Sequence, residues 1–484
     1  MKHILKHTPA EPTSAGRFSA PVRWVLVSLS LSMLMSSLGT SIANVALPTL
    51  VGVFGVTFQQ VQWVVLAYLL AITTLIVSVG RLGDLLGHRR LLLWGISLFT
   101  VASIVGGSFS YGVLIAARVV QGVGAAIMMA LSMAFVADTV PKDRTGRAMG
   151  LLGTMSAMGT ALGPSLGGML IASLGWRAIF WVNVPLGIVA WILTLRHLPA
   201  DSEHAKPRLT DFDGIGTMLL AVTLAAYALG MTMGRGHWGA QNIVLLLLAG
   251  AGLAVFLLAE TRVNSPLIRL VMLRDPVLSA GLVMSALVST VLMATLVVGP
   301  FYLSHALLLD TAVVGLVMSS GPIVSALSGV PAGYVVDRFG AKNMVALGLT
   351  GILAGTGMLA LLPVSLGIAG YVLPIMVTTY GYALFQAANN TMVMTGIPAG
   401  QRGSISGLLN LFRNLGLITG ASVMGAIYAI AAGETGTLTV QPEAVAAGLH
   451  LTFGVAAVLM VVALVVALWG RGIMLQPRVE PKGE

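Results

Sequence analysis

Long apolar runs limit what this sequence can fold into more than any other feature. Runs of about 20 apolar residues recur along the 484-residue chain with short breaks, and about 20 residues of helix cross the hydrocarbon core of a bilayer. These segments are expected to be helices, because the strands of a barrel would be shorter and would alternate in polarity. We predict fourteen spans, near 23–48, 60–79, 91–109, 111–136, 148–173, 178–195, 212–233, 242–259, 277–302, 312–332, 343–363, 368–393, 403–430 and 450–470.

The composition excludes a soluble globular chain and a disordered one. Hydrophobic residues make up 57% of the sequence and charged residues 9%, whereas soluble domains carry about 25% charged residues. Fourteen spans would use about 280 residues, which leaves no room for a large soluble domain. The chain has no cysteine, and so no disulfide, thiolate nucleophile or cysteine metal site. The sequence therefore predicts an all-α integral membrane protein.

The basic residues predict the orientation of the spans. All but four of the 26 Lys and Arg residues lie in the two tails or in alternate loops between spans. The opposite set of loops carries only Arg177 and Arg235, and Arg118 and Arg413 lie inside spans. Because Lys and Arg are retained on the cytoplasmic side, we predict that both tails are cytoplasmic. This bias explains the net charge of +10 without a nucleic-acid partner.

An internal repeat indicates two related halves. The loop after the second span and the loop after the tenth share glycine, aspartate and glycine at identical spacing: Gly80, Asp84 and Gly87, then Gly333, Asp337 and Gly340. Each loop joins the second and third helix of a six-helix half. Parallel halves around a central pathway are a transporter design. The predicted order is tail 1–22, six-helix bundle 23–195, linker 196–211, two-helix insert 212–259, linker 260–276, six-helix bundle 277–470 and tail 471–484.

Three further motifs lie within spans. The fourth span carries the run from Arg118 to Gly124, and the fifth carries the run from Gly159 to Gly168. Gly159, Gly163 and Gly167 recur every four residues and so form one smooth helix face, and Pro164 permits a kink. The first span ends in Asn-Val-Ala-Leu-Pro at 44–48.

With these motifs and the 80–90 loop, nearly the whole chain resembles the major facilitator superfamily, specifically its 14-spanning drug:proton antiporter branch. The resemblance implies a major facilitator fold of two six-helix bundles plus a two-helix insert. It implies that the repeated loops gate the pathway, that the fourth-span arginine takes part in proton movement and that the fifth-span run is the antiporter motif. The gating candidates are Gly80, Asp84, Gly87, His88, Arg89, Arg90, Asp138, Gly333, Asp337, Arg338 and Gly340.

The proton-coupling candidates are Arg118, Asp138 and His88. His88 replaces a residue that is usually basic in the family and tends to pair with an acid at the end of the fourth span, here Asp138. Such a contact would titrate near neutral pH; a solvated loop histidine is the alternative.

The chain departs from this branch at Gly39, where many members carry an aspartate. All 16 acidic residues fall in loops, tails or span edges. A pathway with arginine and no acid is expected to disfavour dications and to accept neutral, zwitterionic or anionic compounds.

Polar residues inside spans are candidates for contact with a substrate, because such side chains usually face the bundle interior. We expect about half of them to line a pathway and the others to bridge helices. The candidates are Asn44, Gln62, Trp63, Tyr68, Gln121, Tyr382, Gln386, Asn389, Asn390, Asn410, Arg413 and Asn414, with Tyr227 and Tyr380 beside them.

We expect a secondary-active exporter of amphipathic drugs or toxic compounds that works by alternating access in exchange for protons. The alternatives are an exporter of an endogenous metabolite or lipid without strict proton coupling and a membrane sensor that does not transport. An enzyme is disfavoured, because no nucleophile–base pair or acid–histidine cluster lies at mid-depth. The expected partners are the substrate, protons and membrane lipid. No cofactor or metal is expected, and we expect a functional monomer in a bacterial cytoplasmic membrane.

Overall fold

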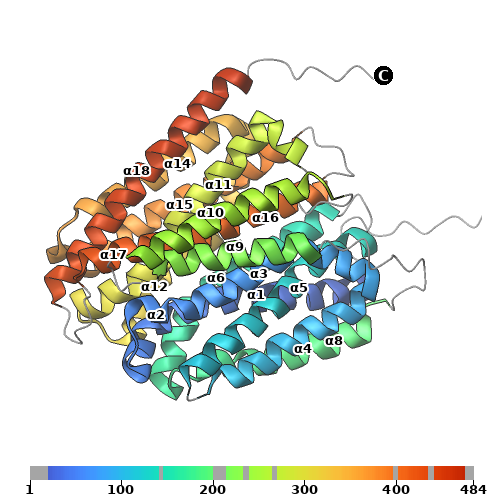
Figure 1. Cartoon of the computed structure of the whole chain (residues 1–484), viewed down its shortest axis with the longest axis horizontal. Helices are drawn as coiled ribbons and strands as arrows, with labels where there is room; N and C mark the ends of the chain where they lie inside the picture. The colour runs from blue at the N-terminus through green and yellow to red at the C-terminus, as the bar shows by residue number, and fades with distance from the viewer. Residues whose placement is uncertain are drawn as a thin grey trace, which may run out of the picture.

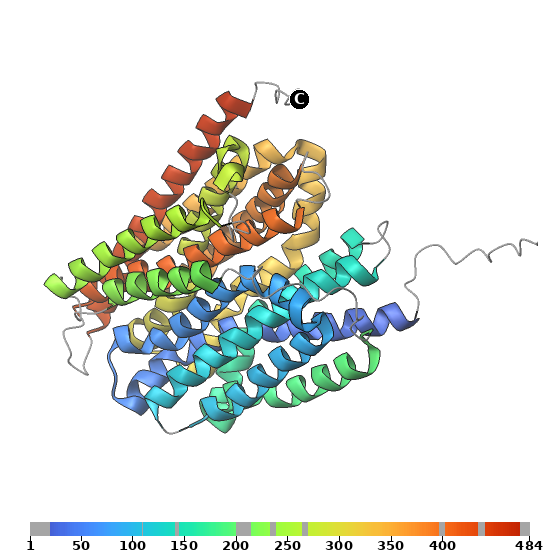
Figure 2. The same cartoon turned by 45° about the vertical axis from the view of Figure 1, so that its right-hand side comes forward.

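The chain is a helical bundle with its helices roughly aligned along one direction (Figures 1 and 2). The computed structural model describes residues 20–108, 110–140, 145–199, 214–232, 239–263, 270–395, 402–433 and 441–474. Every regular element within these ranges is a helix, and 14 helical segments there are long and apolar enough to cross a membrane. This confirms the predicted fold class.

The first six spans form one half of the bundle, coloured blue to teal in Figure 1. Its helices are α1 (Ala20–Phe54), α2 (Phe58–Val61), α3 (Trp63–Leu86), α4 (His88–Gly106), α5 (Tyr111–Thr139), α6 (Thr145–Leu174), α7 (Ala178–Trp181) and α8 (Asn183–His197). Two of these spans are each interrupted by a short break: one span consists of α2 and α3, and the other consists of α7 and α8.

The insert and the second half follow. The insert is α9 (Gly214–Thr232) and α10 (Ala240–Glu260). The second half comprises the 3-10 turn η2 (Leu270–Arg274), α11 (Pro276–Phe301), the π turn η3 (Tyr302–Ala306), α12 (Thr311–Met318), α13 (Ser320–Phe339), α14 (Ala341–Leu361), η4 (Val364–Leu366), α15 (Gly367–Met394), α16 (Arg402–Thr419), the π turn η6 (Gly420–Met424), α17 (Gly425–Ala431) and α18 (Pro442–Met474).

The last span begins eight residues before its predicted start at 450. Helix α18 already begins at Pro442, with Glu443 in its first turn and His450 two turns further on. An apolar run undercounts such a helix, because polar residues interrupt its first turns.

The first and last long helices distinguish the two ends of the bundle. The terminal end is where α1 begins and α18 ends, and the opposite end is where α1 ends and α18 begins. In Figure 1 the terminal end lies to the right, and α2 and α17 mark the opposite end at the left.

The repeated loops adopt the same backbone conformation at the terminal end. Gly87, between α3 and α4, has φ 91° and ψ 129°, and Gly340, between α13 and α14, has φ 85° and ψ 138°. A side chain rarely tolerates this conformation, so glycine is required at both turns. The predicted repeat is therefore a repeat of backbone geometry as well as of residue type.

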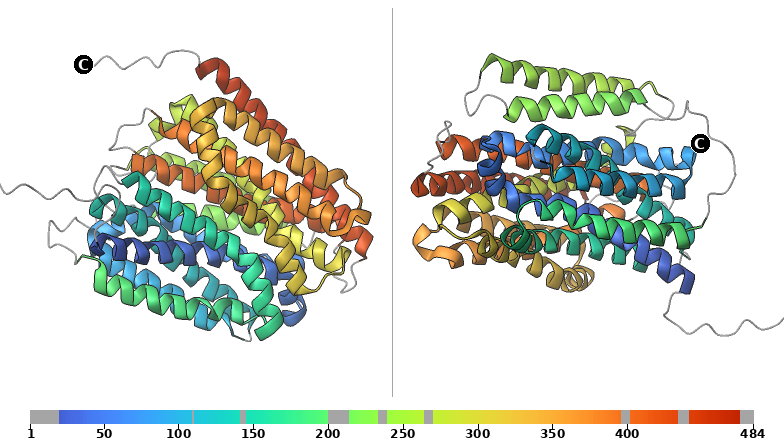
Figure 3. Two further views of the ribbon diagram at one scale, coloured as in Figure 1. Left: turned by 180° about the vertical axis from the view of Figure 1, so that it is seen from behind. Right: turned by 90° about the horizontal axis from the view of Figure 1, so that it is seen from below.

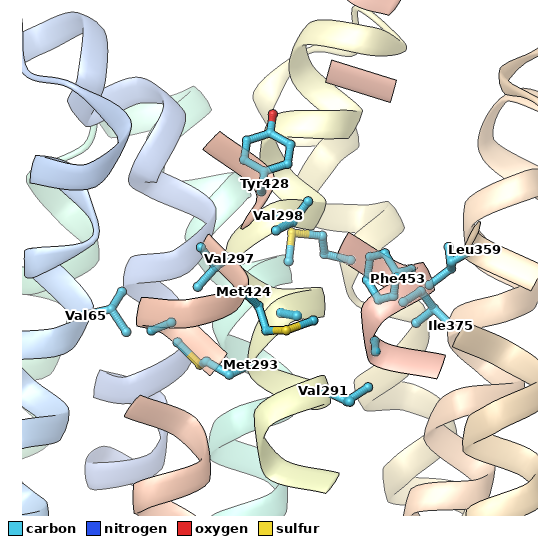
Figure 4. Packing of buried hydrophobic residues seen from close by; sticks show 14 of the residues in the cluster. Val65, Val291, Met293, Val297, Val298, Leu359, Ile375, Met424, Tyr428 and Phe453 are labelled. Carbon is cyan, nitrogen blue, oxygen red and sulfur yellow. The ribbon is translucent and has the colours of Figure 1, made fainter. Parts of the chain in front are cut away.

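The two halves share a buried apolar core at the opposite end. Every member from the first half comes from the opposite-end portion of its helix. Figure 4 shows part of this shared core, with Val65 of α3 at its edge beside Val297 and Met424 of the second half. The first half has a further cluster of its own toward the terminal end. Residues of the insert and the second half form another, against which Leu70 of α3 also packs.

The insert lies as an outer layer across the seam between the halves (Figure 3, right). On the first half, the hydroxyls of Thr217 in α9 and Ser78 in α3 are 2.7 Å apart. On the second half, the Tyr227 hydroxyl of α9 donates to Thr419 Oγ1 of α16 at 3.3 Å. Leu220 and Leu224 of α9 also join the apolar cluster of the second half. Helix α9 therefore contacts both halves.

Replacing Gly340 by alanine tests whether the turn requires glycine. No atom lies within 4 Å of a Cβ built there, so the only penalty is the backbone conformation, worth about 1–3 kcal/mol of unfolding free energy. Gly357 in α14 also has open space for a Cβ but adopts ordinary helical geometry. We expect Gly340→Ala to lower the unfolding temperature in detergent and Gly357→Ala to leave it unchanged or raise it. Equal unfolding temperatures would refute the requirement.

Candidate transport pathway

Arg118 is buried at the centre of the first half, with 1% of its surface exposed. Its Nε donates to the Val64 carbonyl of α3 at 2.6 Å, and its Nη2 donates to the Gly39 carbonyl of α1 at 3.0 Å. Its Nη1 donates to Gln121 Oε1 at 2.6 Å. A charged residue at the centre of a membrane helix costs about 2.5–3.5 kcal/mol, so these bonds are what permit Arg118 there.

Aromatic and hydroxyl side chains complete the surroundings of Arg118. Its guanidinium lies over the Tyr68 ring, 4.1 Å from the centroid, and the Tyr68 hydroxyl donates to the Ser36 carbonyl at 2.7 Å. Gln121 Nε2 donates to Ser103 Oγ of α4 at 2.7 Å. The network thus joins α1, α3, α4 and α5. Tyr68 and Gln121 are fully buried and support Arg118 in this structure.

Aromatic rings surround Gly39, the position where the resemblance expects an acid. A Cβ built on Gly39 would lie 3.0 Å from the Tyr68 hydroxyl and 3.1 Å from Cζ of Phe99. Its carbonyl is the acceptor for Arg118. At this position Arg118 therefore donates to a backbone carbonyl and not to a carboxylate.

An aromatic cluster joins the halves at the opposite end. The Phe58 ring of α2 lies 4.7 Å from the Phe301 ring of α11 and 5.0 Å from the Tyr428 ring of α17, centroid to centroid. One turn further along the chain, Gln62 Nε2 donates to the Ala421 carbonyl at 2.8 Å. Gln62, a substrate candidate, thus bridges the halves in this state.

The glycine run of α6 has two packing faces. Gly159, Gly163 and Gly167 pack against α1, with a Cβ at Gly167 meeting Cγ1 of Val45 at 2.6 Å. The adjacent face meets the second half: a Cβ at Gly168 would lie 2.8 Å from the Cα of Gly315 in α12. A Cβ at Gly315 would in turn lie 2.7 Å from the carbonyl of Pro164.

These glycines allow helix backbones to touch within the first half and across the seam. In lipid, helices associate by close packing and hydrogen bonds rather than by the hydrophobic effect. The antiporter motif proposed from the sequence is, in this structure, a packing surface between three helices.

The first repeated loop is only partly described. His88 begins α4 and packs edge-on against Phe135 of α5, with ring centroids 5.8 Å apart. His88 is half-buried against α5, which is also the helix that carries Asp138. Arg89 donates through Nη2 to the Leu195 carbonyl of α8, and Arg90 is exposed. The side chains of Asp84 and Asp138 lie outside the described set, so the predicted His88–Asp138 contact stays a prediction.

The second repeated loop is more exposed. Asp337 and Arg338 both face outward at the terminal end, and the Arg338 guanidinium lies 5.5 Å from the centroid of the Phe339 ring. Gly333 has open space where a Cβ would lie.

Two of the asparagine candidates, Asn44 and Asn389, pack between helices. Asn44 Nδ2 donates to its own helix, to the carbonyls of Thr40 at 3.0 Å and Ser41 at 3.3 Å. Asn389 Nδ2 donates to the Gly281 carbonyl of α11 at 3.2 Å. Both side chains are buried between helices.

Two polar groups on the second half are less buried. On α15, Gln386 Nε2 donates to Asn390 Oδ1 at 3.4 Å; Gln386 is half-buried and Asn390 is exposed. On α16, Asn410 and Arg413 are half-buried and Asn414 is buried. The aromatic candidates Trp63 and Tyr382 are half-buried against the shared core.

Sequence reasoning missed the hydroxyl residues that connect helices. Ser103 completes the Arg118 network, and Ser78 with Thr217 joins the insert to the first half. A serine or threonine within an apolar run gives no individual signal, because its hydroxyl can also bond to its own helix. Within the described residues, no group of three or more His, Asp and Glu gathers as a metal site would.

A bundle of 14 membrane helices in two related halves, with polar groups inside and an internal seam, is the architecture of a membrane transporter. The family model described as the Major Facilitator Superfamily matches residues 29–421, and the chain belongs to that superfamily.

The relatives and solved structures agree with this assignment. The chain is 33% identical to the multidrug resistance protein Stp of Mycobacterium tuberculosis, over 84% of this chain and 75% of that one. It is 32% identical to the drug efflux pump JefA of the same species, over 84% and 80%. It also has the fold of the crystallised D-xylose–proton symporter, with a TM-score of 0.68 and 15% identity over 93% of this chain and 97% of that one.

Replacing Gln121 by leucine tests the Arg118 network. The change removes one acceptor from a buried guanidinium and one donor from Ser103. We expect a loss of about 1–3 kcal/mol in unfolding free energy. Gln386→Leu, which removes only a 3.4 Å bond, is the control and should stay within about 0.5 kcal/mol of the parent protein. Chemical unfolding in detergent measures the unfolding free energy of both variants. Equal losses would contradict the supporting role of Gln121 in the Arg118 network.

Proposed function

We propose that this transporter exports amphipathic small molecules, including drugs, in exchange for protons by alternating access between its two halves. The observation that carries the proposal is the shared apolar core, to which the first half contributes only residues from the opposite-end portions of its helices, whereas the rest of the first half forms a cluster of its own. Relatives named as a multidrug resistance protein and a drug efflux pump support the substrate class.

The basic residues support the sidedness of the proposal. They gather at the tails and at the loops of the terminal end, such as Arg89 and Arg90 beside Gly87, so the terminal end is assigned to the cytoplasm. The packed opposite end then faces outward. The structure corresponds, on this assignment, to a state closed toward the outside, from which an exporter would collect its substrate.

The contacts across the closed end include groups that can separate at little cost. The rings of Phe58, Phe301 and Tyr428 meet through their edges and faces, and Gln62 contributes one hydrogen bond across the seam. Such a bond is worth only about 1 kcal/mol between membrane helices. Contacts of this size suit a seam that must open and close in each cycle.

A second function, export of a metabolite or lipid without strict proton coupling, is favoured by one observation. The space around Gly39 is filled by Tyr68 and Phe99, so that site offers no room for an acid that exchanges protons with substrate. Proton exchange would then fall to the remaining candidates, Arg118, Asp138 and His88.

Everted membrane vesicles with an acid interior distinguish the two functions. The test compounds share one aromatic body: naphthalenesulfonate as anion, naphthalenesulfonamide as neutral compound and naphthylmethyl-trimethylammonium as cation. An antiporter will release luminal protons when one of them is added, and the luminal pH will rise. Asp84→Asn is expected to slow this release by about tenfold or more. Glu443→Gln, a change of an exposed acid at the start of α18, is the control.

Uptake of a compound without a change in luminal pH would favour export without proton coupling. Uptake and proton release that are equally fast in Asp84→Asn would exclude the predicted gating role of that residue. A full panel without uptake or proton release would contradict drug export and favour the sensor.

Cross-linking tests alternating access directly, and a chain without cysteine suits it. The pair Phe58→Cys and Tyr428→Cys lies across the seam, and the pair Phe54→Cys and Tyr111→Cys lies within the first half, where the two rings are 6.1 Å apart. A short thiol cross-linker is expected to abolish transport by the first pair and to spare the second. Full transport by a cross-linked first pair would rule out opening at this end.

A further inference from the structure

Arg413 is the second arginine inside a span, and its surroundings differ from those of Arg118. It lies 11 residues after the start of α16 at Arg402, about 16 Å along the helix. Its side chain is half-buried. No hydrogen bond, ion pair or ring contact joins it to any residue that the structure describes, whereas every nitrogen of the Arg118 guanidinium donates to an acceptor.

Two sides of α16 are fixed by packing. Gly416 lies against α11, where a Cβ would meet the Ser289 Cβ at 2.8 Å, and Thr290 Oγ1 donates to the Gly416 carbonyl at 3.1 Å. About 60° to 80° around the helix from that side, Thr419 accepts the hydrogen bond from Tyr227 of the insert.

The third side faces the first half. Gln62, at the break between α2 and α3, donates to the Ala421 carbonyl and would touch a Cβ at Gly425. With 100° per residue within α16, Asn410, Arg413 and Leu417 lie on the side of the helix away from Thr419 and the insert, next to the side that packs on α11. This sector looks into the interior between the halves, because the insert covers the other side of the helix.

The residues of this sector change from polar to apolar along the helix. Asn410 and Arg413 come first, and the buried Asn414 lies at the edge toward α3. The Nδ2 of Asn414 has no hydrogen-bond partner among the described residues. Leu417 and Met424 follow toward the opposite end, packed in the shared core. A cation with neighbouring amides, next to an apolar wall, matches a molecule with an anionic head and an apolar body.

Nothing described nearby neutralises Arg413. The acidic side chains whose surroundings the structure describes lie at the ends of their helices, at Glu260, Asp275, Asp310, Asp337 and Glu443. None of them forms an ion pair with Arg413. The charge is therefore available to a group that enters from outside the protein.

We propose that Arg413, with Asn410 and Asn414, forms a subsite for the sulfonate, carboxylate or phenolate head of an amphipathic monoanion, whose apolar body lies along Leu417. The proposal deepens the proposed function, because it assigns the charge class of the substrate. A guanidinium donates two parallel hydrogen bonds to such a head, and the buried Nδ2 of Asn414 supplies a further donor. A dication would be repelled at the same place.

Equilibrium binding to the full-length protein in nanodiscs of phosphatidylcholine tests the subsite. The probes are naphthalenesulfonate and naphthalenesulfonamide, which differ in charge and share one apolar body. We expect Arg413→Gln to weaken sulfonate binding by about tenfold or more and to leave sulfonamide binding within about twofold. Arg413→Lys keeps the charge and should recover part of the sulfonate affinity. Arg262→Gln, which removes an exposed arginine after α10, is the control.

Three results would overturn the proposal: equal binding of the sulfonate by parent protein and Arg413→Gln, an equal loss for both probes, or tighter binding of naphthylmethyl-trimethylammonium than of the sulfonate. If phosphatidylglycerol in the nanodisc displaces the sulfonate in the parent but not in Arg413→Gln, the occupant is an anionic lipid head and the substrate assignment is wrong. A melting temperature for each variant separates lost binding from lost folding. Binding at equilibrium needs neither proton exchange nor outward transport, so failure of the proposed function leaves this result interpretable.

Discussion

The guanidinium of Arg118 organises the first half at a depth where lipid offers no hydrogen-bond acceptor. Its donors reach α1 and α3 directly, and through Gln121 and Ser103 they reach α4. Each helix must keep its position for the charge to remain satisfied, because a charged donor left without an acceptor costs more than a neutral one. One hydrogen-bonded network thereby links four of the helices.

The seam itself is built from weaker and closer contacts. Gly168 and Gly315 bring two backbones together, and Phe58 packs between rings of the second half. Packing between backbones is strong only while the surfaces fit, and it vanishes over a short separation. The contrast between a hydrogen-bonded interior and a packed seam separates what holds each half together from what joins the two halves. The two arginines inside spans follow the same division, since Arg118 bonds to other residues and Arg413 has no partner among the residues that the structure describes.

The sequence predicted the parts of the fold that depend on patterns. Apolar runs predicted the spans. The glycines of the repeated loops predicted tight turns, and the turns at Gly87 and Gly340 have a backbone conformation that favours glycine. The site was less predictable. Asn44 and Asn389 are both asparagines within apolar runs, yet one bonds to its own helix and the other to the Gly281 carbonyl of α11. Residue type indicates that a polar group avoids lipid, but the neighbouring helix decides whether it finds a partner. The bridge from Ser78 to Thr217 likewise depends on where the insert lies.

The position of the insert makes the two lateral sides of the transporter unequal. Helix α9 covers the seam between α3 and α16, bonded to Ser78 on one flank and to Thr419 on the other, while α10 lies outside it. On the other side, α6 meets α12 directly through Gly168 and Gly315. A hydrophobic molecule dissolved in the bilayer thus encounters a double wall of helices on one side and a single wall on the other. The two lateral surfaces that the protein presents to the membrane therefore differ, and the two-helix insert creates this difference.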